Sequence, residues 1–108
     1  MVMKTILLAL CLSVATASAG VASWYGEELR GRPMANCRPF NPDRLTAASW
    51  HYPLGTKLRV THGRRSVVVT VTDRGPNKRL GRSIDLSRAA FKRLAPLDKG
   101  LIEVIITP

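Results

Sequence analysis

Cysteine is scarce in this chain of 108 residues, which contains only Cys11 and Cys37. Because Cys11 lies in a leader segment that we expect to be removed, one cysteine remains and an internal disulfide is excluded. Histidine is equally scarce. His51 and His62 have no cysteine or carboxylate partners at metal-ligand spacing, so we expect no zinc site. No metal or organic cofactor is expected, and stability has to come from backbone closure and core packing.

Long apolar runs are also missing, apart from one near the start of the chain. There Lys4 precedes the apolar stretch Ile6–Ala15, and the small residues Ala17–Ala19 follow it. This order is typical of a signal peptide that is cleaved after Ala19. The run is much shorter than the roughly 20 residues that span a bilayer. We therefore expect residues 1–19 to be a signal peptide, residues 20–108 to form one exported domain, and no integral membrane span.

The leader contains a cysteine, but its context does not match a lipoprotein signal. Such a signal needs a small residue before the cysteine, at the end of the apolar run, whereas Leu10 precedes Cys11 within the run. We expect no lipid anchor. The expected location is the periplasm or cell envelope, with the domain soluble after signal cleavage.

Acidic residues are few, with 7 Asp and Glu against 17 Lys and Arg, giving a formal net charge of +10. The hydrophobic fraction of 45% excludes a disordered basic tail. Basic clusters at Arg64-Arg65 and at 78–82 fit either a solvated surface or attraction to an anionic polymer. We expect no nucleic-acid partner, because the leader predicts export and no recognition helix is evident. Nothing in the sequence fixes the oligomeric state.

Short runs of β-branched residues, separated by turn residues, predict a mainly β domain. One helix is expected at Ser87–Leu94, capped by Ser87 and ended by Pro96, and a second helical turn after Pro42. Several short strands with one or two small helices favour a closed barrel, because closure removes exposed strand edges. The expected strands are residues 20–25, 56–61, 66–72 and 101–106.

The order of several short motifs resembles that of the rare lipoprotein A (RlpA) family. Asp-Arg-Gly-Pro alone would be a weak signal, but the motifs follow one another in the expected order over nearly all of the predicted domain. They are Ala22–Gly26, Gly31–Asn36, Leu45–Ala48, Pro53–Thr56, Val69–Pro76 and Gly81–Ser87.

The resemblance implies a fold, a partner and an activity. The implied fold is a six-stranded double-psi β-barrel with one or two short helices. The implied partner is the glycan strand of peptidoglycan, and several family members are lytic transglycosylases. The acidic site residue of the family matches Asp73, whereas its glutamate falls at Arg38 and its histidine at Ser49. The chain therefore departs from the family pattern at two of three polar site positions.

One carboxyl group is sufficient for a lytic transglycosylase, because the same group acts first as acid and then as base. Hydrolysis normally needs two carboxylates that flank the bond. We therefore predict Asp73 as the general acid/base, against the alternative that it only binds nearby backbone amides in a turn. The two replacements at Arg38 and Ser49 favour another alternative, a non-catalytic, expansin-like module that binds the cell wall.

Five further residues are predicted to bind substrate. Trp24 and Tyr25 alternate on a strand, so we expect Trp24 in the core and the Tyr25 hydroxyl at the groove. Asp85 is interpreted as mainly structural, and Cys37 as a partly buried free thiol. The predicted substrate-binding residues are Tyr25, Arg38, Thr46, Ser49 and Arg74.

Overall fold

The computed structural model describes residues 16–77 and 81–108. The predicted signal peptide lies outside the described residues up to position 15. Its last residues, Ser18 and Ala19, form the first pairs of strand β1 with Ile106 and Ile105. The strand therefore begins two residues before the predicted domain boundary.

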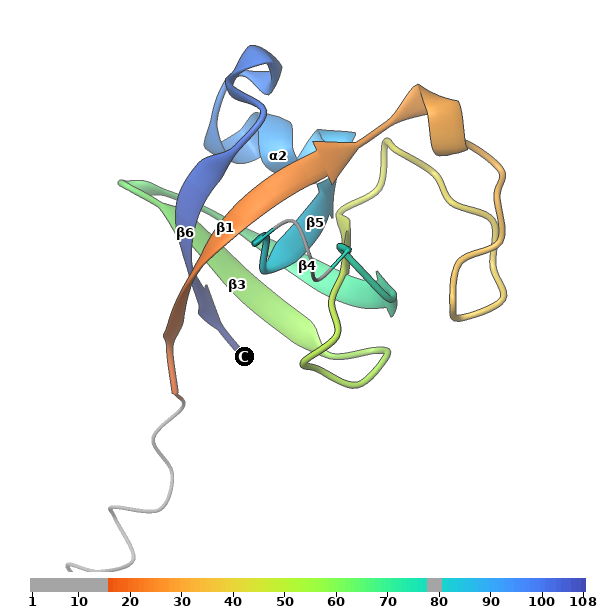
Figure 1. The fold of residues 1–108 in the computed structure, drawn as a ribbon, viewed down its shortest axis with the longest axis horizontal. Helices are drawn as coiled ribbons and strands as arrows, with labels where there is room; N and C mark the ends of the chain where they lie inside the picture. The colour runs from red at the N-terminus through yellow and green to blue at the C-terminus, as the bar shows by residue number, and fades with distance from the viewer. Residues whose placement is uncertain (1–15, 78–80) are drawn as a thin grey trace, which may run out of the picture.

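Six strands close into a barrel in the order β1-β5-β2-β4-β3-β6 (Figure 1). Two of the pairings, β1 with β5 and β2 with β4, are parallel, and the others are antiparallel. This is a double-psi β-barrel, as the resemblance to the RlpA family implies. The strands are β1 (Ser18–Tyr25), β2 (Thr46–Ala48), β3 (Lys57–His62), β4 (Arg65–Asp73), β5 (Ile84–Ser87) and β6 (Ile102–Thr107).

Alternation of side chains explains why these segments form a barrel. In β4, Val67, Val69 and Val71 are buried, whereas the residues between them are more exposed. Because successive strand residues point to opposite faces, one face fills the barrel and the other meets solvent. Leu58 and Val60 of β3 have no exposed surface and complete the same core.

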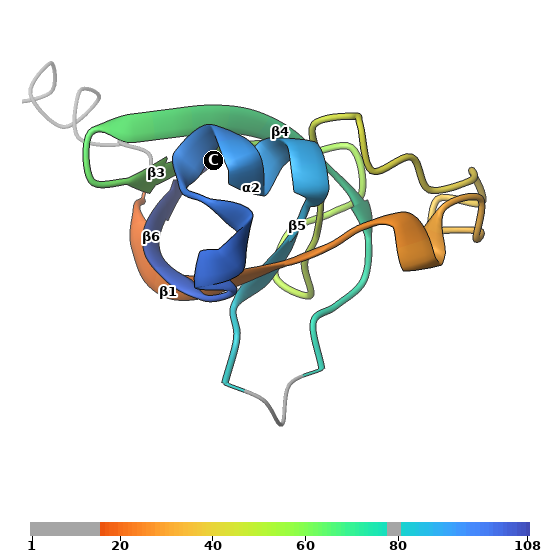
Figure 2. The same ribbon diagram turned by 90° about the horizontal axis from the view of Figure 1, so that it is seen from above.

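Helix α2 (Arg88–Leu94) closes one end of the barrel, where it lies across the opening in Figure 2. As predicted, Ser87 caps it, accepting a hydrogen bond from the backbone N–H of Ala90 at 3.3 Å. Phe91 and Leu94 point into the core. The predicted helical turn after Pro42 is wrong, because that segment forms a turn without helical structure.

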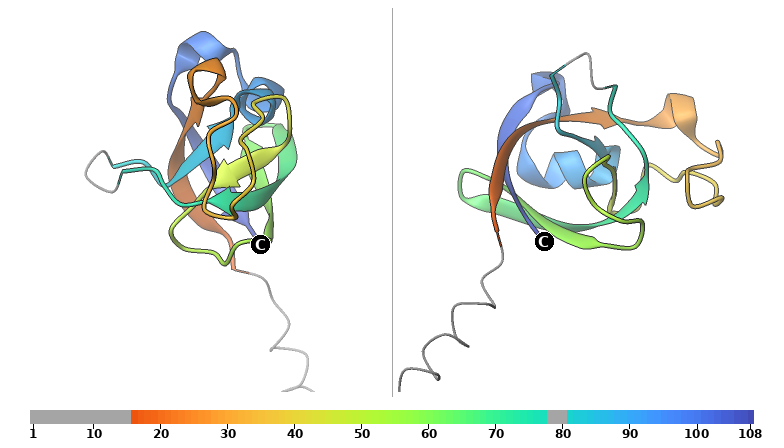
Figure 3. Two further views of the ribbon diagram at one scale, coloured as in Figure 1. Left: turned by 90° about the vertical axis from the view of Figure 1, so that its right-hand side faces the viewer. Right: turned by 60° about the horizontal axis from the view of Figure 1, so that its bottom comes forward.

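Two short 3-10 turns, η1 (Glu27–Leu29) and η3 (Leu97–Lys99), were not expected from the sequence. The first opens a long loop, residues 26–45, that stands away from the barrel (Figure 3). Arg88 of α2 pairs with Asp43 at 2.7 Å and with Glu27 at 3.0 Å. These contacts fasten both ends of the loop to the helix.

Candidate functional site

Two carboxylates lie in one row across four neighbouring strands. Ser23 of β1 pairs with Asp85 of β5, which pairs with Ala48 of β2, which in turn pairs with Asp73 of β4. Neighbouring strands are about 4.8 Å apart, so one small residue separates the two aspartates across the sheet. The antiparallel pairing of β5 with β2 joins the two parallel pairs into this row.

Asp73 is held by the loop and remains half-exposed. Its Oδ1 accepts hydrogen bonds from the backbone N–H of Ala35 at 2.9 Å and of Arg74 at 2.8 Å. Within residues 16–77 and 81–108 its other oxygen, Oδ2, accepts no hydrogen bond. One oxygen thus fixes the orientation of the carboxylate, and the other has no hydrogen-bond partner among the described residues.

Asp85 contacts side chains of the barrel itself, which fits its interpretation as mainly structural. Its Oδ1 accepts a hydrogen bond from the hydroxyl of Ser23, and Nη1 of Arg82 lies 3.9 Å from the same oxygen. Arg82 also donates to the Ser23 hydroxyl at 3.1 Å. Ser23 is 62 residues away along the chain, so no local motif signals this contact.

The hydroxyl of Tyr25 is buried and lies within electrostatic range of both carboxylates. Burial raises the pKa of this phenol, and the charges of Asp73 and Asp85 raise it further. The phenol therefore keeps its proton and can donate a hydrogen bond. Its ring stacks on Phe40 of the long loop, with centroids 4.4 Å apart, and its buried oxygen has no partner among the described residues. As expected, Trp24 packs against the core instead.

A groove of about 850 Å³ runs between the long loop and strands β2 and β4. Neither Asp73 nor Tyr25 is among its lining residues, although the hydroxyl of Tyr25 was expected there. The lining residue next to Asp73 in sequence is Thr72, whose carbonyl accepts the backbone N–H of Asn36 at 3.2 Å. Two predicted substrate-binding residues, Arg38 and Thr46, line it. The polar lining is rich in hydroxyl and amide groups, which suit a ligand that carries many hydroxyls. These residues include Asn36, Asn41, Thr46, Thr70 and Thr72.

Ser49 and Arg74 have structural contacts. Ser49 is only 1% exposed, and its hydroxyl accepts the backbone N–H of His51 at 3.1 Å. Nη1 of Arg74 donates to the carbonyls of Ser49 at 2.8 Å and Tyr52 at 2.6 Å. The guanidinium thus fixes the loop that follows β2. The predicted contacts of Ser49 and Arg74 with substrate stay predictions.

Cys37 is exposed, so its interpretation as a partly buried thiol is wrong. Its φ is 69°, and its N–H donates to the carbonyl of Met34 at 2.9 Å in a tight turn. Side chains at such turns point into solvent, and the left-handed backbone favours glycine. The geometry of the turn therefore explains why the thiol of Cys37 is exposed, although an apolar side chain is more often buried.

No group of three or more His, Cys, Asp or Glu side chains that could hold a metal occurs in the described part of the chain. Among the helices of residues 16–77 and 81–108, none has the length and hydropathy of a membrane span.

The barrel order and the row of carboxylates define the chain as a double-psi β-barrel protein with a polar surface groove. Residues 17–106 match a family model described as lytic transglycolase. The chain belongs to this family, the RlpA-like proteins.

Three relatives illustrate the range of the family. A probable endolytic peptidoglycan transglycosylase RlpA of Nostoc is 45% identical, over 87% of this chain and 26% of its own length. The endolytic peptidoglycan transglycosylase RlpA of Yersinia pestis is 51% identical, over 69% of this chain and 21% of its own. An uncharacterized protein of Synechocystis is 48% identical, over 80% of this chain and 92% of its own. The chain thus spans about a quarter of the length of the two transglycosylases.

Solved structures share the fold. The Streptomyces papain inhibitor superimposes with a TM-score of 0.70 at 25% identity, covering 88% of this chain and 96% of that one. An apo expansin of Clavibacter michiganensis has a TM-score of 0.67 at 30% identity, covering 86% of this chain and 50% of that one. A point mutant of that expansin was solved in complex with cellohexaose.

Proposed function

We propose that this domain is an exported lytic transglycosylase that cleaves the glycan strands of peptidoglycan. The single observation that carries the proposal is the placement of Asp73. One of its oxygens is fixed by backbone amides, and the other has no hydrogen bond within the described residues, beside a second carboxylate and a protonated phenol. Relatives named as endolytic peptidoglycan transglycosylases support the same activity.

In the proposed reaction, Asp73 acts twice. Its protonated Oδ2 gives a proton to the glycosidic oxygen, and the bond between that oxygen and C1 of the muramic acid breaks. The resulting carboxylate then takes the proton of the C6 hydroxyl, whose oxygen bonds to C1 and closes a 1,6-anhydro ring. Acid and base are thus one group, and no water is consumed. The two amides on Oδ1 keep the carboxylate in place through both steps.

The groove is the proposed binding site of the glycan strand. Its cavity of about 850 Å³ is large enough for a short run of sugar rings. The hydroxyls of Thr70 and Thr72 offer both donors and acceptors to sugar hydroxyls, whereas that of Thr46 is buried in the wall. Arg38 adds a positive charge, which favours a strand that carries carboxylates. Tyr25 is proposed to keep its proton and to donate a hydrogen bond to a site carboxylate.

A second candidate is a non-catalytic module that binds the cell wall, as the sequence also allows. Two observations favour it. Arg38 and Ser49 replace the glutamate and histidine of the family pattern, and Ser49 is buried beneath its loop. The likeness to an expansin and to a papain inhibitor also fits a module that binds without cleaving. In a module that only binds, the role of Asp73 would be structural, as an acceptor of hydrogen bonds from backbone N–H groups such as that of Ala35.

Product analysis separates the two candidates. The protein is incubated with peptidoglycan sacculi, and the released and bound material is analysed by mass spectrometry. A lytic transglycosylase gives 1,6-anhydromuramyl ends, whereas a hydrolase gives reducing ends. Retention on sacculi without any new chain end would support the binding module and reject the enzyme. Boiled protein provides the background.

Export remains part of the proposal. The order of charged, apolar and small residues in Met1–Ala19 supports secretion through a cleaved signal peptide. We expect the domain to act in the periplasm or cell envelope, where its substrate lies. N-terminal sequencing of the protein recovered from the envelope fraction tests this, with Gly20 expected as the first residue.

A further inference from the structure

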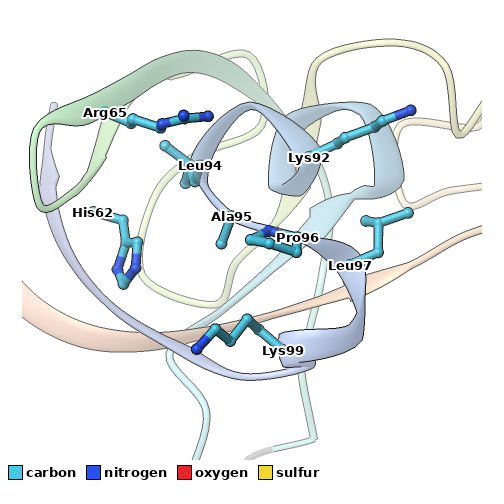
Figure 4. Close-up of a pocket in the computed structure, with 8 residues that line it drawn as sticks. All are labelled: His62, Arg65, Lys92, Leu94, Ala95, Pro96, Leu97 and Lys99. Carbon is cyan, nitrogen blue, oxygen red and sulfur yellow. The ribbon is translucent and has the colours of Figure 1, made fainter.

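A second cavity, of about 570 Å³, opens at the end of the barrel that α2 covers (Figure 4). Its wall consists of Leu94, Ala95, Pro96 and Leu97, at the end of the helix and in the turn that follows. Figure 4 shows Arg65 and Lys99 on opposite sides of these apolar residues. We call this cavity, with His62 and Lys92 also in its lining, the basic pocket.

Local hydrogen bonds give the basic pocket a defined shape. The N–H of Ala95 donates to the carbonyl of Phe91 at 3.0 Å and ends α2, and Pro96 prevents the helix from continuing. Gly100 then adopts a φ of 71° and turns the chain into β6. On the opposite side, Nδ1–H of His62 donates to the carbonyl of Glu103 at 2.7 Å, which orients the imidazole ring.

The cations of the basic pocket are not neutralised by the protein. Within residues 16–77 and 81–108, Arg65, Lys92 and Lys99 form no ion pair, and the pocket lining contains no carboxylate. Arg30 and Arg88 differ, because both pair with Asp43 and Glu27 at 3.0 Å or less. The side chains that line the basic pocket offer hydrogen-bond donors and positive charge but no anionic group.

The basic pocket shares no lining residue with the groove and is far from Asp73. Arg65 and Asp73 are the first and last residues of β4, which puts them roughly 26 Å apart at about 3.3 Å per residue. This separation exceeds the screening length of about 8 Å at physiological ionic strength. A ligand in the basic pocket therefore adds a function to the proposed cleavage of glycan strands and is not part of it.

We propose that the basic pocket binds a phosphate group carried on an apolar body. The apolar wall requires a ligand with a hydrocarbon part, and cations on opposite sides of that wall require an anion that accepts from several directions. The oxygens of a phosphate are arranged tetrahedrally, whereas the two oxygens of a carboxylate lie in one plane. The cavity volume falls in the range of small-ligand sites. A phospholipid headgroup and a soluble phosphorylated compound both carry this chemistry.

Titration of the 15N-labelled protein with hexyl phosphate tests the proposal. We expect shifted amide signals around Leu94 to Lys99 and at least tenfold weaker binding of inorganic phosphate and of hexanoate. In the double variant Arg65→Gln/Lys99→Gln, hexyl phosphate should bind at least tenfold more weakly. The matched control Lys57→Gln/Arg59→Gln removes the same charge from the exposed side of β3 and should bind as the wild type does.

Sedimentation with vesicles distinguishes the sources of the phosphate. Retention on vesicles that contain phosphatidylglycerol, lost in Arg65→Gln/Lys99→Gln but kept in the control, assigns the pocket to lipid headgroups. Binding of hexyl phosphate without vesicle retention assigns it to soluble phosphorylated compounds. The proposal is overturned if neither probe binds, if both double variants lose binding equally, or if hexanoate binds as tightly as hexyl phosphate. Asp73→Asn should leave every one of these results unchanged.

Discussion

The two ends of the barrel differ in charge and in the way they are held together. One end carries Asp73 at the end of β4, where the backbone N–H groups of Ala35 and Arg74 donate to its Oδ1. The other end carries Arg65 and Lys99 over an apolar wall, and α2 closes it by packing into the core. Hydrogen bonds from the backbone thus orient one carboxylate at the first end, whereas the apolar closure of the second end has cations on its rim.

The strands themselves explain this division. Their inward residues are mainly apolar, and Arg65 and Asp73 lie at the two ends of β4, where loops begin. Because β4 reaches from one end to the other, changes at Arg65 and at Asp73 should act independently.

The largest expected change in stability comes from Phe91, which is fully buried in the apolar closure. Phe91→Ala should lower the free energy of unfolding by about 3–5 kcal/mol, because it removes an aromatic ring and leaves a cavity. Urea denaturation monitored by circular dichroism measures this. Phe91→Leu keeps most of the buried volume and should lose clearly less. If both variants lost the same free energy of unfolding, packing of the Phe91 side chain would not be what stabilises the end closed by α2.

A smaller loss is expected at the opposite end, on replacement of Arg74. Nη1 of this side chain donates to two carbonyls, and hydrogen bonds from charged groups contribute about 1.5–3 kcal/mol. Because Arg74 is partly exposed, Arg74→Ala should cost about 2 kcal/mol in the same denaturation experiment. Arg64→Ala, at an exposed turn, is the matched control and should cost less than about 0.5 kcal/mol. A loss no larger than that of the control would reject the anchoring role.

A modest gain is expected at Cys37, whose φ of 69° is strained for any residue with a Cβ. Cys37→Gly should raise the free energy of unfolding by about 0.5–1 kcal/mol, since glycine adopts this backbone without strain. Cys37→Ser retains the Cβ and should show no gain. A destabilised glycine variant would mean that the thiol contributes contacts to the turn.

The smallest effect is expected from the exposed ion pairs that fasten the long loop to α2. Hydrogen bonding to Arg30 lowers the pKa of Glu27 from 4.5 to about 2 in the folded protein. The folded pKa is below the unfolded value, so the stabilisation is complete above about pH 4.5 and is lost as pH falls towards 2. Melting temperatures of Glu27→Gln should depend less on pH in this window than those of the wild type.

Glu103→Gln is the control for this measurement, because Glu103 is exposed and forms no ion pair in the described part of the chain. Its melting temperatures should follow those of the wild type. Added salt should reduce the difference between Glu27→Gln and the wild type, since solvent and ions screen exposed pairs. A difference that persists in 1 M salt would contradict an electrostatic origin.

The long strands of the fold could be predicted because their own residues specify them. Alternating and β-branched residues mark β3, β4 and β6 to within one or two residues, and Ser87 marks the start of α2. The strands β2 and β5 are only three and four residues long, so their sequences carry little strand signal. Their structure comes from pairing with neighbours on both sides within the closed barrel.

The candidate site could be predicted in part. The motif around Asp73 identified a carboxylate at a strand end, and the alternation of Trp24 and Tyr25 indicated which ring leaves the core. The hydrogen bond of Asp85 with Ser23 and that of Asp73 with Ala35 join positions far apart in sequence. Such contacts depend on the order of strands in the barrel, which local patterns do not contain.

The rate at which Asp73→Asn releases 1,6-anhydromuramyl ends from sacculi is the decisive quantity. Asparagine keeps an oxygen for the amides of Ala35 and Arg74 but cannot transfer a proton as a carboxyl group does. Because acid-base catalysis contributes about 10²–10⁴-fold, the rate should fall at least 100-fold while binding to sacculi is retained. Asp98→Asn, an exposed aspartate in η3, should keep the wild-type rate. A wild-type rate in Asp73→Asn would contradict proton transfer by Asp73.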